Sequence, residues 1–295
     1  MSSVSAKGVA AQAAARLNLT SGWDGAWRGP CPCCNYAKPT LAIRVRDGGI
    51  AVSCVACGES AGIAVIAGIP ADLLLPAEPK ASKLAKALNL WTKGALASGT
   101  PVERYLNGRG VTIPVPPSIR YLARQRNWTD GQFYPAIISL VERVPGNDDR
   151  QGGPLLSSGI HLTFLQGHGT DGAVRKAATG QCKLSLGRLR YAGVWLSPIK
   201  EIGHEMVVAE GIETALSVMQ ITGLPTAAAL SAAGMRAFRW PPRVRKLWIA
   251  ADNDPTGRQA ADMLLGRALA AGLDARIKIP AMNCNDFNDF LRNAR

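Results

Sequence analysis

Two short apolar runs that end in acidic residues constrain the fold of this chain more than any other feature. The first run is residues 206–209, followed by Glu210, and the second is residues 246–251, followed by Asp252 and Asp254. Runs of this length with β-branched residues, separated by helical patterns, are typical of buried parallel strands. Ligands bind at the carboxyl ends of the strands in open α/β sheets. We therefore expect these three acids to meet at one edge of a sheet.

The rest of the C-terminal region continues the alternation of strands and helices. We expect further strands at residues 225–230 and 275–279, helices at 214–221 and 256–271, and a short last helix in DFNDFL. Because right-handed crossovers connect parallel strands, all the strands of this region are expected in one Rossmann-like parallel sheet. The fold class predicted for the chain is α/β.

The acids at the strand ends are suited to a divalent metal ion. Two aspartates one residue apart can hold one cation, and Glu210 can complete the site or act as a general base. Magnesium binds few carboxylates and fills its shell with waters and substrate phosphates. Gly211 and Gly257 allow close approach of the backbone. The pattern favours phosphoryl transfer with Mg²⁺ or Mn²⁺, although an isolated D-x-D pair often only caps a helix.

Two C-x-x-C pairs near the N-terminus predict a structural zinc site. The pairs are Cys31 with Cys34 and Cys54 with Cys57, and nineteen residues lie between them. Alternating apolar residues at 40–46 and 50–53, around a turn at Asp47-Gly48-Gly49, predict a hairpin between the pairs. Four thiolates at the ends of a hairpin can surround one zinc ion and close its coordination sphere. This arrangement is typical of a zinc ribbon.

Other interpretations of these cysteines are a disulfide or unrelated buried thiols. A cytoplasmic chain disfavours disulfides. Cys33 is a spare thiol that could replace a neighbouring ligand, although the spacing favours Cys31 and Cys34.

Most of the positive charge lies in the middle of the chain. The net charge is +13, and residues 80–200 contain 17 Lys and Arg against 6 Asp and Glu, which gives +11. From residue 201 onward the counts are nearly balanced, 11 against 10. A basic region beside an acidic site favours a channel for a polyanion. The alternative is charge that serves only solubility.

The middle region is expected to be a small α+β subdomain. Helical patterns begin at Lys83 and in PVERYLNGRGV, while FYPAIISLVERV and GIHLTFLQ are typical of strands. Its candidate contacts to nucleotide or template, together with two arginines of the N-terminal hairpin, are Arg109, Lys176, Lys183, Arg188, Arg190, Arg44 and Arg46. A solvated basic loop is the alternative for the cluster at residues 176–190. His161 is more typical of a structural residue than of a nucleotide contact.

The chain is long enough for several domains, and its composition excludes a disordered or membrane-spanning protein. Hydrophobic residues make up 47% and charged residues 19%. No apolar run reaches the length of a membrane helix, and no secretory signal is evident, so we expect a cytoplasmic protein. The predicted domains are residues 1–75, 80–200 and 201–295.

The motifs VVAEGIETALS and LWIAADNDPTG resemble those of a Toprim domain, the catalytic fold shared by primases, topoisomerases and some nucleases. The order of zinc ribbon, basic RNA-polymerase-like subdomain and Toprim domain is similar to the small primases of phages, plasmids and integrated elements. The segment NCNDFNDFL is similar to the Asp-rich end of that region, which makes Asp286 and Asp289 candidate outer metal or phosphate residues. Such primases usually have an aspartate four residues after the catalytic glutamate. Here that position is Thr214, and whether the preceding Glu213 substitutes for it is open.

This resemblance implies synthesis of RNA primers on single-stranded DNA. Asp252 and Asp254 would bind magnesium, Glu210 would be a ligand or base, and the zinc ribbon would help to read the template. Nucleoside triphosphates are the implied substrates. A separate helicase is the implied partner, because the sequence contains no G-x-x-x-x-G-K-[ST] motif. The alternatives are a Toprim nuclease or topoisomerase-like DNA-cleaving enzyme, and a non-catalytic nucleic-acid-binding module.

Overall fold

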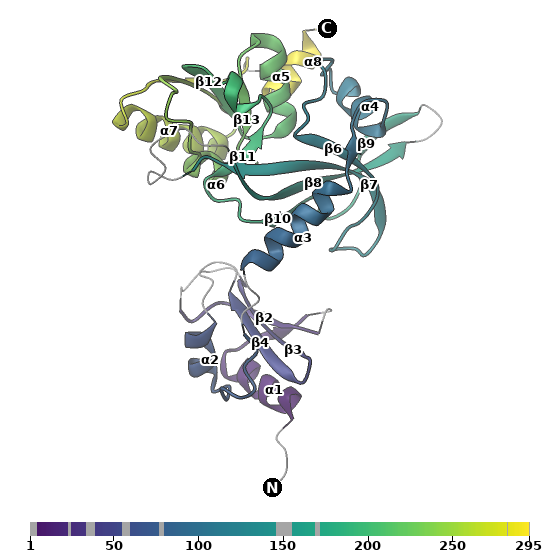
Figure 1. Ribbon diagram of the computed structural model, residues 1–295, viewed down its shortest axis with the longest axis vertical. Coiled ribbons are helices and arrows are strands. Elements are labelled where there is room, and N and C mark those ends of the chain that lie inside the picture. Colours follow the sequence, from purple (N-terminus) through teal and green to yellow (C-terminus); the bar gives the residue numbers. More distant parts are fainter. Residues whose placement is uncertain are drawn as a thin grey trace. The chain divides into compact units, whose positions relative to one another are not determined.

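The chain forms two compact units, which are described separately. In the computed structural model, the first unit is Met1–Lys80 and the second is Ala81–Arg295 (Figure 1). The structure describes residues 5–22, 25–33, 39–54, 60–76, 80–145, 155–168, 172–281 and 283–294. Among these residues, no helix combines the length and the apolar character needed to span a membrane.

The first unit contains a small antiparallel sheet whose strands follow one another in chain order. These strands are β1 (Thr20–Ser21), β2 (Trp27–Gly29), β3 (Leu41–Arg46) and β4 (Gly49–Cys54). Arg46 pairs with Gly49 across the turn between β3 and β4. The turn residues Asp47 and Gly48 have positive φ angles of 49° and 75°, as a type I′ turn requires. The predicted hairpin is therefore confirmed.

Helices cover this sheet and close its core. They are α1 (Ala6–Arg16) and α2 (Ala61–Ala67). The Gly8 amide donates to Ser5 Oγ at 3.2 Å, which caps the start of α1. Gly68, with a φ of 69°, ends α2 in the left-handed conformation. The apolar side chains buried between helices and strands include Val9, Ala10, Ala13, Leu41, Ile43, Ile50, Val52, Ile63 and Ala64.

Two of the predicted zinc ligands lie near strand ends of this sheet. Cys54 is the last residue of β4, and Cys31 follows shortly after β2. Their side chains are only 3% and 1% exposed, whereas Cys33 is exposed. The other predicted ligands, Cys34 and Cys57, lie outside the described residues. The zinc site therefore stays a prediction.

Metal analysis of cysteine variants tests the predicted zinc site. We expect the purified protein to hold about one zinc ion per chain, and Cys54→Ser to lose it, because the exchange removes a thiolate ligand. The variant should also unfold at a lower temperature, since metal binding and folding are coupled in small zinc domains. Cys33→Ser is the matched control and should keep its zinc. Equal zinc contents in both variants would contradict the assignment.

The second unit is organised around one large sheet that combines antiparallel and parallel strands (Figure 1). Its main path runs in the order β10-β8-β7-β11-β13-β12-β14-β15, while β6 pairs with β5 and β7, and β9 pairs with β8. The antiparallel part contains β5 (Ala95–Leu96), β6 (Ile119–Arg126), β7 (Phe133–Arg143), β8 (Leu156–His168), β9 (Ala173–Lys176), β10 (Lys183–Gly187) and β11 (Ala192–Trp195). The parallel part contains β12 (Glu205–Ala209), β13 (Thr226–Ala228), β14 (Lys246–Ala250) and β15 (Asp274–Lys278).

The parallel part confirms the predicted α/β fold class. β12 pairs in parallel with β13 and β14, and β14 pairs in parallel with β15. The helices between and after these strands are α5 (Ile212–Thr222), α6 (Ala232–Ala237), α7 (Pro255–Ala270) and α8 (Phe287–Asn293). The strands and helices expected from the sequence pattern are therefore present, and α6 is an additional short helix.

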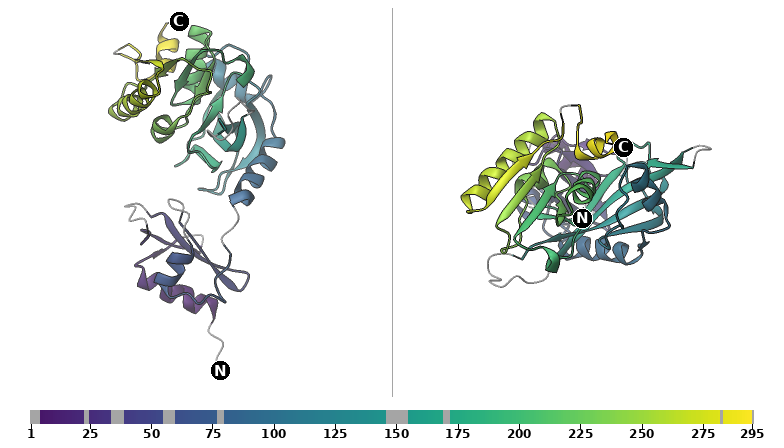
Figure 2. Two further views of the ribbon diagram at one scale, coloured as in Figure 1. Left: turned by 60° about the vertical axis from the view of Figure 1, so that its left-hand side comes forward. Right: turned by 90° about the horizontal axis from the view of Figure 1, so that it is seen from above.

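Helices cover both faces of the parallel strands (Figure 2). Leu247 and Ile249 of β14 share a buried cluster with Leu264 of α7. Ala250 belongs to the cluster on the other face, together with Ala215 of α5. Because neighbouring residues of a strand face opposite sides, the sheet is buried between two layers of helix.

The antiparallel part is covered in the same way by α3 (Lys80–Thr92) and α4 (Pro101–Gly108). Neighbouring residues of β7 face different helices: Ile137 packs in the cluster of Leu106 from α4, and Ile138 packs in the cluster of Ala87 from α3. A 3₁₀ turn (Ile199–Glu201) leads from this part into β12.

Strand β11 joins the two parts of the sheet. It is antiparallel to β7 through Ala192 and Gly193, and antiparallel to β13 through Val194 and Trp195. A Cβ atom on Gly193 would lie 2.7 Å from the Ala228 carbonyl oxygen, so glycine permits this close approach. The predicted regions 80–200 and 201–295 thus share one continuous sheet.

Candidate active site

The carboxyl ends of β12 and β14 bring the predicted acids together. The two strands pair in parallel with Ala209 opposite Ala250. Glu210 follows Ala209 directly, and Asp252 lies two residues beyond Ala250. The negative charges of Glu210 and Asp254 both raise the pKa of Asp252, so the three carboxylates interact. We call this edge of the sheet the acidic edge.

The Asp252 side chain is half-buried, and one of its oxygens is buried without a hydrogen-bond partner among the described residues. Its Oδ1 atom is buried and accepts no hydrogen bond from any described residue. Burial raises the pKa of Asp252 to about 7, and the charges of Glu210 and Asp286 add to this effect. Lys183 acts in the opposite direction. A buried carboxylate oxygen without a donor is unfavourable, and a bound cation would relieve it.

Asp286 reaches the acidic edge because two loops are hydrogen-bonded. The backbone N–H of Asn253 donates to the backbone carbonyl of Asn285 at 2.7 Å. The side-chain Nδ2 of Asn253 donates to the backbone carbonyl of Cys284 at 3.0 Å. Asp286 also caps α8, because its Oδ1 accepts a hydrogen bond from the Asp289 amide at 2.7 Å. The structure therefore brings the Asp286 carboxylate to the acids, whereas Asp289 contributes its backbone to the cap.

Asp254 links the acidic edge to the start of α7. Its Oδ1 accepts a hydrogen bond from the Gly257 amide at 2.8 Å and caps the helix. A Cβ atom on Gly257 would lie 2.9 Å from the Asp252 carbonyl oxygen, so only glycine lets the helix begin this close to β14. The helix N-terminus adds a partial positive charge, which favours phosphate.

Glu210 is held at the start of α6. Burial raises its pKa, and the charge of Asp254 adds to this. A hydrogen bond from the Ala232 amide and the positive charges of Lys183 and Arg236 oppose the shift. The net effect keeps Glu210 a stronger proton acceptor than an exposed glutamate.

These residues fit an ion that keeps part of its water shell. In the described parts of the chain, no three His, Cys, Asp or Glu side chains form a ready-made metal-binding group. Mg²⁺ does not need one, because it binds through one or two carboxylates and takes other ligands from water and phosphate. The unsatisfied Asp252 Oδ1, with Glu210 and Asp254 beside it, is a suitable donor set.

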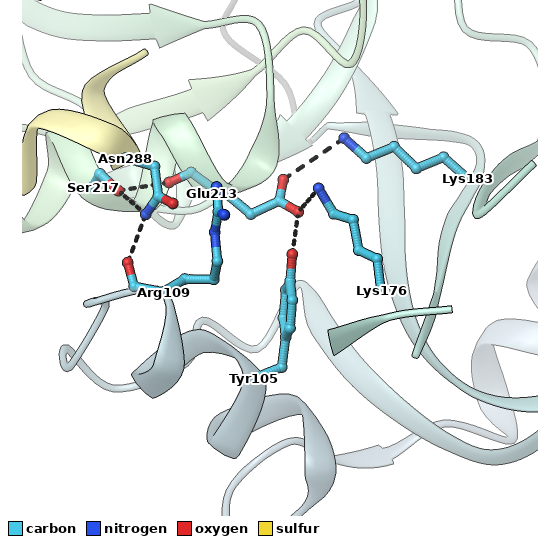
Figure 3. A network of polar contacts seen from close by, with 7 residues as sticks. All are labelled: Tyr105, Arg109, Lys176, Lys183, Glu213, Ser217 and Asn288. Atoms are coloured by element: carbon cyan, nitrogen blue, oxygen red, sulfur yellow. Dashed lines mark hydrogen bonds and ion pairs between the residues drawn. The ribbon is translucent and has the colours of Figure 1, made fainter. Parts of the chain in front are cut away.

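Glu213 lies in a separate buried network (Figure 3). Tyr105 Oη donates to Glu213 Oε1 at 2.8 Å, and Lys176 Nζ lies 2.8 Å from the same oxygen. Lys183 Nζ lies 3.8 Å from Oε2. Glu213 is only 6% exposed, and burial alone would raise its pKa, but Lys183 and Lys176 lower it below the usual range. The carboxylate is therefore ionised inside the protein.

The same network continues to α8. Ser217 Oγ donates to the Glu213 carbonyl at 2.8 Å. Asn288 Nδ2 donates to Ser217 Oγ at 2.9 Å and to the Arg109 carbonyl at 2.7 Å (Figure 3). One buried asparagine thus joins α5, α8 and the end of α4.

Lys183 connects the Glu213 network with the acidic edge. Its ammonium pairs with Glu213 and also lowers the pKa values of Glu210 and Asp252. Its side chain is 41% exposed, so a ligand could reach it. The basic middle region therefore contributes a cation to the acids of the following region.

The other predicted basic residues have different surroundings. Lys176 is bound to Glu213. Arg188 and Arg190 follow β10 and are exposed. Arg44 and Arg46 are exposed on β3 in the first unit.

His161 fits the structural interpretation. It is buried, and its Nδ1 lies 2.8 Å from Ser185 Oγ. Burial lowers the pKa of His161 to about 4, so the ring is neutral at pH 7.

Sequence reasoning missed the uncharged members of the Glu213 network. Tyr105 lies in a helix whose neighbouring Val102 and Leu106 are buried, and it resembles an ordinary core residue there. Its hydroxyl was the available signal, because a buried tyrosine usually has a hydrogen-bond partner. Asn288 gave a similar signal as an amide inside a short helix.

Replacing Glu213 tests the buried network. Glu213→Gln should lower the free energy of unfolding by about 2 kcal/mol at pH 7, because it leaves two lysines without their buried counter-charge. The native pKa is lowered, so this stabilisation is present above the unfolded value of about 4.3 and is lost as pH falls toward the native value. Urea unfolding at several pH values measures the difference. Glu201→Gln, at an exposed position, is the control, and equal effects of the two exchanges would refute the network's role.

Thermal unfolding with and without MgCl₂ tests the acidic edge as a metal site. At pH 8, Mg²⁺ should raise the unfolding temperature of the wild type and leave that of Asp252→Asn unchanged, because ligands stabilise the state that binds them. Without Mg²⁺, the raised native pKa of Asp252 makes the wild type lose stability as pH rises from about 4 to about 7. Asp252→Asn should remove this loss. Asp262→Asn, exposed on α7, should behave like the wild type; a Mg²⁺ shift retained in Asp252→Asn would exclude Asp252 as a ligand.

Comparison with solved structures finds low-identity likenesses to primases. The primase fragment of the Bacteriophage T7 primase-helicase protein has a TM-score of 0.38 and 14% identity, covering 90% of this chain and 93% of that chain. The Aquifex aeolicus primase (zinc binding and RNA polymerase domains) has a TM-score of 0.42 and 12% identity, covering 99% and 83%. A DNA primase domain from Pseudomonas aeruginosa has a TM-score of 0.41 and 17% identity, covering 73% and 75%. With TM-scores below 0.5, we draw no conclusion from these likenesses.

Family comparison gives a firmer result. No curated protein matches the chain in sequence. Residues 81–196 match a family described as a domain of unknown function. Residues 205–294 match the Toprim domain, and this segment contains the parallel strands, Glu210, Asp252 and Asp254. The C-terminal part of the chain is therefore a member of the Toprim domain family.

Proposed function

We propose that this protein is a DNA primase, which synthesises short RNA primers on single-stranded DNA by metal-dependent nucleotidyl transfer. The observation that carries the proposal is the position of Lys183. Its ammonium acts on the buried Glu213 and on the acids Glu210 and Asp252. A nucleoside triphosphate at a metal site needs both acids for the metal and a cation for its phosphates, and this edge supplies both.

The residues of the acidic edge have distinct proposed roles. A divalent ion, Mg²⁺ or Mn²⁺, would activate the primer hydroxyl and neutralise the phosphates. Asp252 and Asp254 would hold it, and Glu210 would be a further ligand or a general base. Asp286 and Asp289 are the candidate outer metal or phosphate residues. Glu213 would act by positioning Lys176 and Lys183.

In the proposed reaction, the primer 3′-oxygen attacks the α-phosphorus of the incoming nucleoside triphosphate. A new phosphorus–oxygen bond forms, and the bond from the α-phosphorus to the oxygen bridging to the β-phosphorus breaks, so pyrophosphate leaves. Glu210, whose pKa burial raises, would accept the hydroxyl proton. Lys183 and Lys176 would balance the negative charge on the leaving pyrophosphate.

The remaining predicted contacts would position the substrates. Arg109, Arg188 and Arg190 would each hold nucleotide or template, and Arg44 and Arg46 would help the zinc ribbon to read the template. The substrates would be single-stranded DNA and nucleoside triphosphates. A separate helicase would be the partner, and the protein would act in the cytoplasm, as in primases of phages and mobile elements.

A primer synthesis assay tests the proposal. The protein is incubated with single-stranded DNA, labelled nucleoside triphosphates and Mg²⁺ or Mn²⁺, and the products are separated by size. We expect short ribonucleotide products, and we expect Asp252→Ala and Glu210→Ala to reduce them at least about 100-fold, because they remove metal ligand or base. Asp262→Ala, exposed on α7, is the matched control.

Other outcomes of this assay separate the alternatives. Cleaved DNA without synthesis would replace the primase proposal by a nuclease. DNA binding with neither product would replace it by a non-catalytic binding module.

A further inference from the structure

Two arginines lie on the Tyr191 ring, and a third, on the Trp240 ring, lies beside them. The guanidinium carbon of Arg239 lies 4.2 Å from the centre of the Tyr191 ring, and that of Arg190 lies 4.7 Å from it. Arg267 lies against the Trp240 ring at 5.7 Å. Partial burial of its guanidinium lowers the pKa of Arg267, and the charge of Arg239 lowers it further, so these two cations are neighbours. We call Arg190, Arg239 and Arg267 the arginine patch.

No carboxylate of a described residue balances the charge of the arginine patch. In the parts of the chain that the structure describes, none of its three members forms an ion pair, and all three are exposed. Arg276 shows the ordinary arrangement on the other side of the sheet: it lies 5.9 Å from the Trp248 ring and 3.3 Å from Asp274. Like charges held together repel one another, so a bound anion would stabilise the patch.

The backbone holds the patch in place. Arg267 Nη1 donates to the Arg236 carbonyl at 2.7 Å and to the Phe238 carbonyl at 3.0 Å. Tyr191 has a φ of 66°, which is unusual for a residue other than glycine. It directly precedes β11, which the sheet fixes on both sides. The backbone at Tyr191 and the Arg267 guanidinium are therefore positioned before any ligand arrives.

Helix α6 connects the patch with the acidic edge. The charge of Arg236 acts on Glu210, while its carbonyl accepts the hydrogen bond from Arg267. Because β11 is antiparallel to β13, Tyr191 lies at the carboxyl end of β13. This is the same edge of the sheet at which β12 ends before Glu210.

We propose that the arginine patch binds the phosphate backbone of single-stranded nucleic acid. Guanidinium groups lying on aromatic rings keep their N–H edges for phosphates and an outer face for stacking with bases. The cations that act on the acids are Lys183 and Arg236. The patch is a further set beside them, so it contacts the strand and not the triphosphate at the metal. The identification of this strand as the DNA template rests on the proposed function.

Fluorescence anisotropy with a labelled oligothymidylate tests the patch. The intact chain is titrated at several salt concentrations, as the wild type, Arg239→Ala and the double variant Arg190→Ala/Arg239→Ala. We expect each exchange to weaken binding about tenfold. The slope of log affinity against log salt should fall by about 0.7 for each phosphate that the variant no longer neutralises. Arg276→Ala, which removes one exposed ring-bound arginine elsewhere, should bind like the wild type.

Three results would overturn the inference. The first is an affinity and salt slope of the double variant equal to those of the wild type. The second is equal weakening by Arg276→Ala, which would show only a general charge effect. The third is a double variant that no longer binds a labelled nucleoside triphosphate but still binds DNA like the wild type. This result would make the patch a triphosphate site. Arg239→Gln, which keeps most of the side-chain length, replaces Arg239→Ala if thermal unfolding shows that the latter is misfolded.

The binding assay separates this inference from the proposed function, because it requires no synthesis. A wild type that makes no primers, with patch variants that lose DNA binding, would refute the primase and support the patch. Primer synthesis by the wild type, together with unchanged DNA binding of the patch variants, would support the primase and refute the patch.

Discussion

A carboxylate that stays charged inside the protein links α5 to three other elements of the second unit. Glu213 on α5 is 6% exposed and ionised, because Lys176 and Lys183 reach it from β9 and β10 and Tyr105 donates to it from α4. Without the two lysines, Glu213 would be an uncompensated buried charge. The Toprim domain and the region before it therefore depend on each other. The same interaction orients Lys183 toward the acidic edge. Lys183 therefore contributes both to the contact between the two regions and to the chemistry of the site.

The sequence predicted the parallel part of the fold well, for physical reasons. Buried parallel strands need continuous apolar runs, and β12 and β14 have them, each ending in acid. Strand β11 was not predicted as a link between regions. Its residues, AGVW, form no periodic pattern, and its partners β7 and β13 lie on both sides of it in the chain. Such long-range pairing depends on tertiary contacts, which local patterns do not contain.

The residues of the candidate site were likewise predictable from the sequence only in part. Glu210, Asp252 and Asp254 were found because strand ends and short spacing decide where they lie. Glu213 was a candidate metal residue, but the structure surrounds it with lysines, and that ligand role stays a prediction. Asn288 and Ser217 are 71 residues apart in the chain, and nothing in either local sequence indicates the other. The arginine patch was only partly anticipated, through Arg190, because its other members come from a loop and from the end of α7.

The position of β11 affects how this protein can be divided, in the laboratory or by recombination. The two family matches meet between residues 196 and 205, which suggests two interchangeable modules. A fragment that begins at residue 205 would nevertheless leave the side of β13 that pairs with β11 open. Unpaired strand edges recruit other chains and promote aggregation. The Toprim segment thus matches a family on its own, but alone it would be prone to aggregate. A productive exchange between relatives would have to include β11.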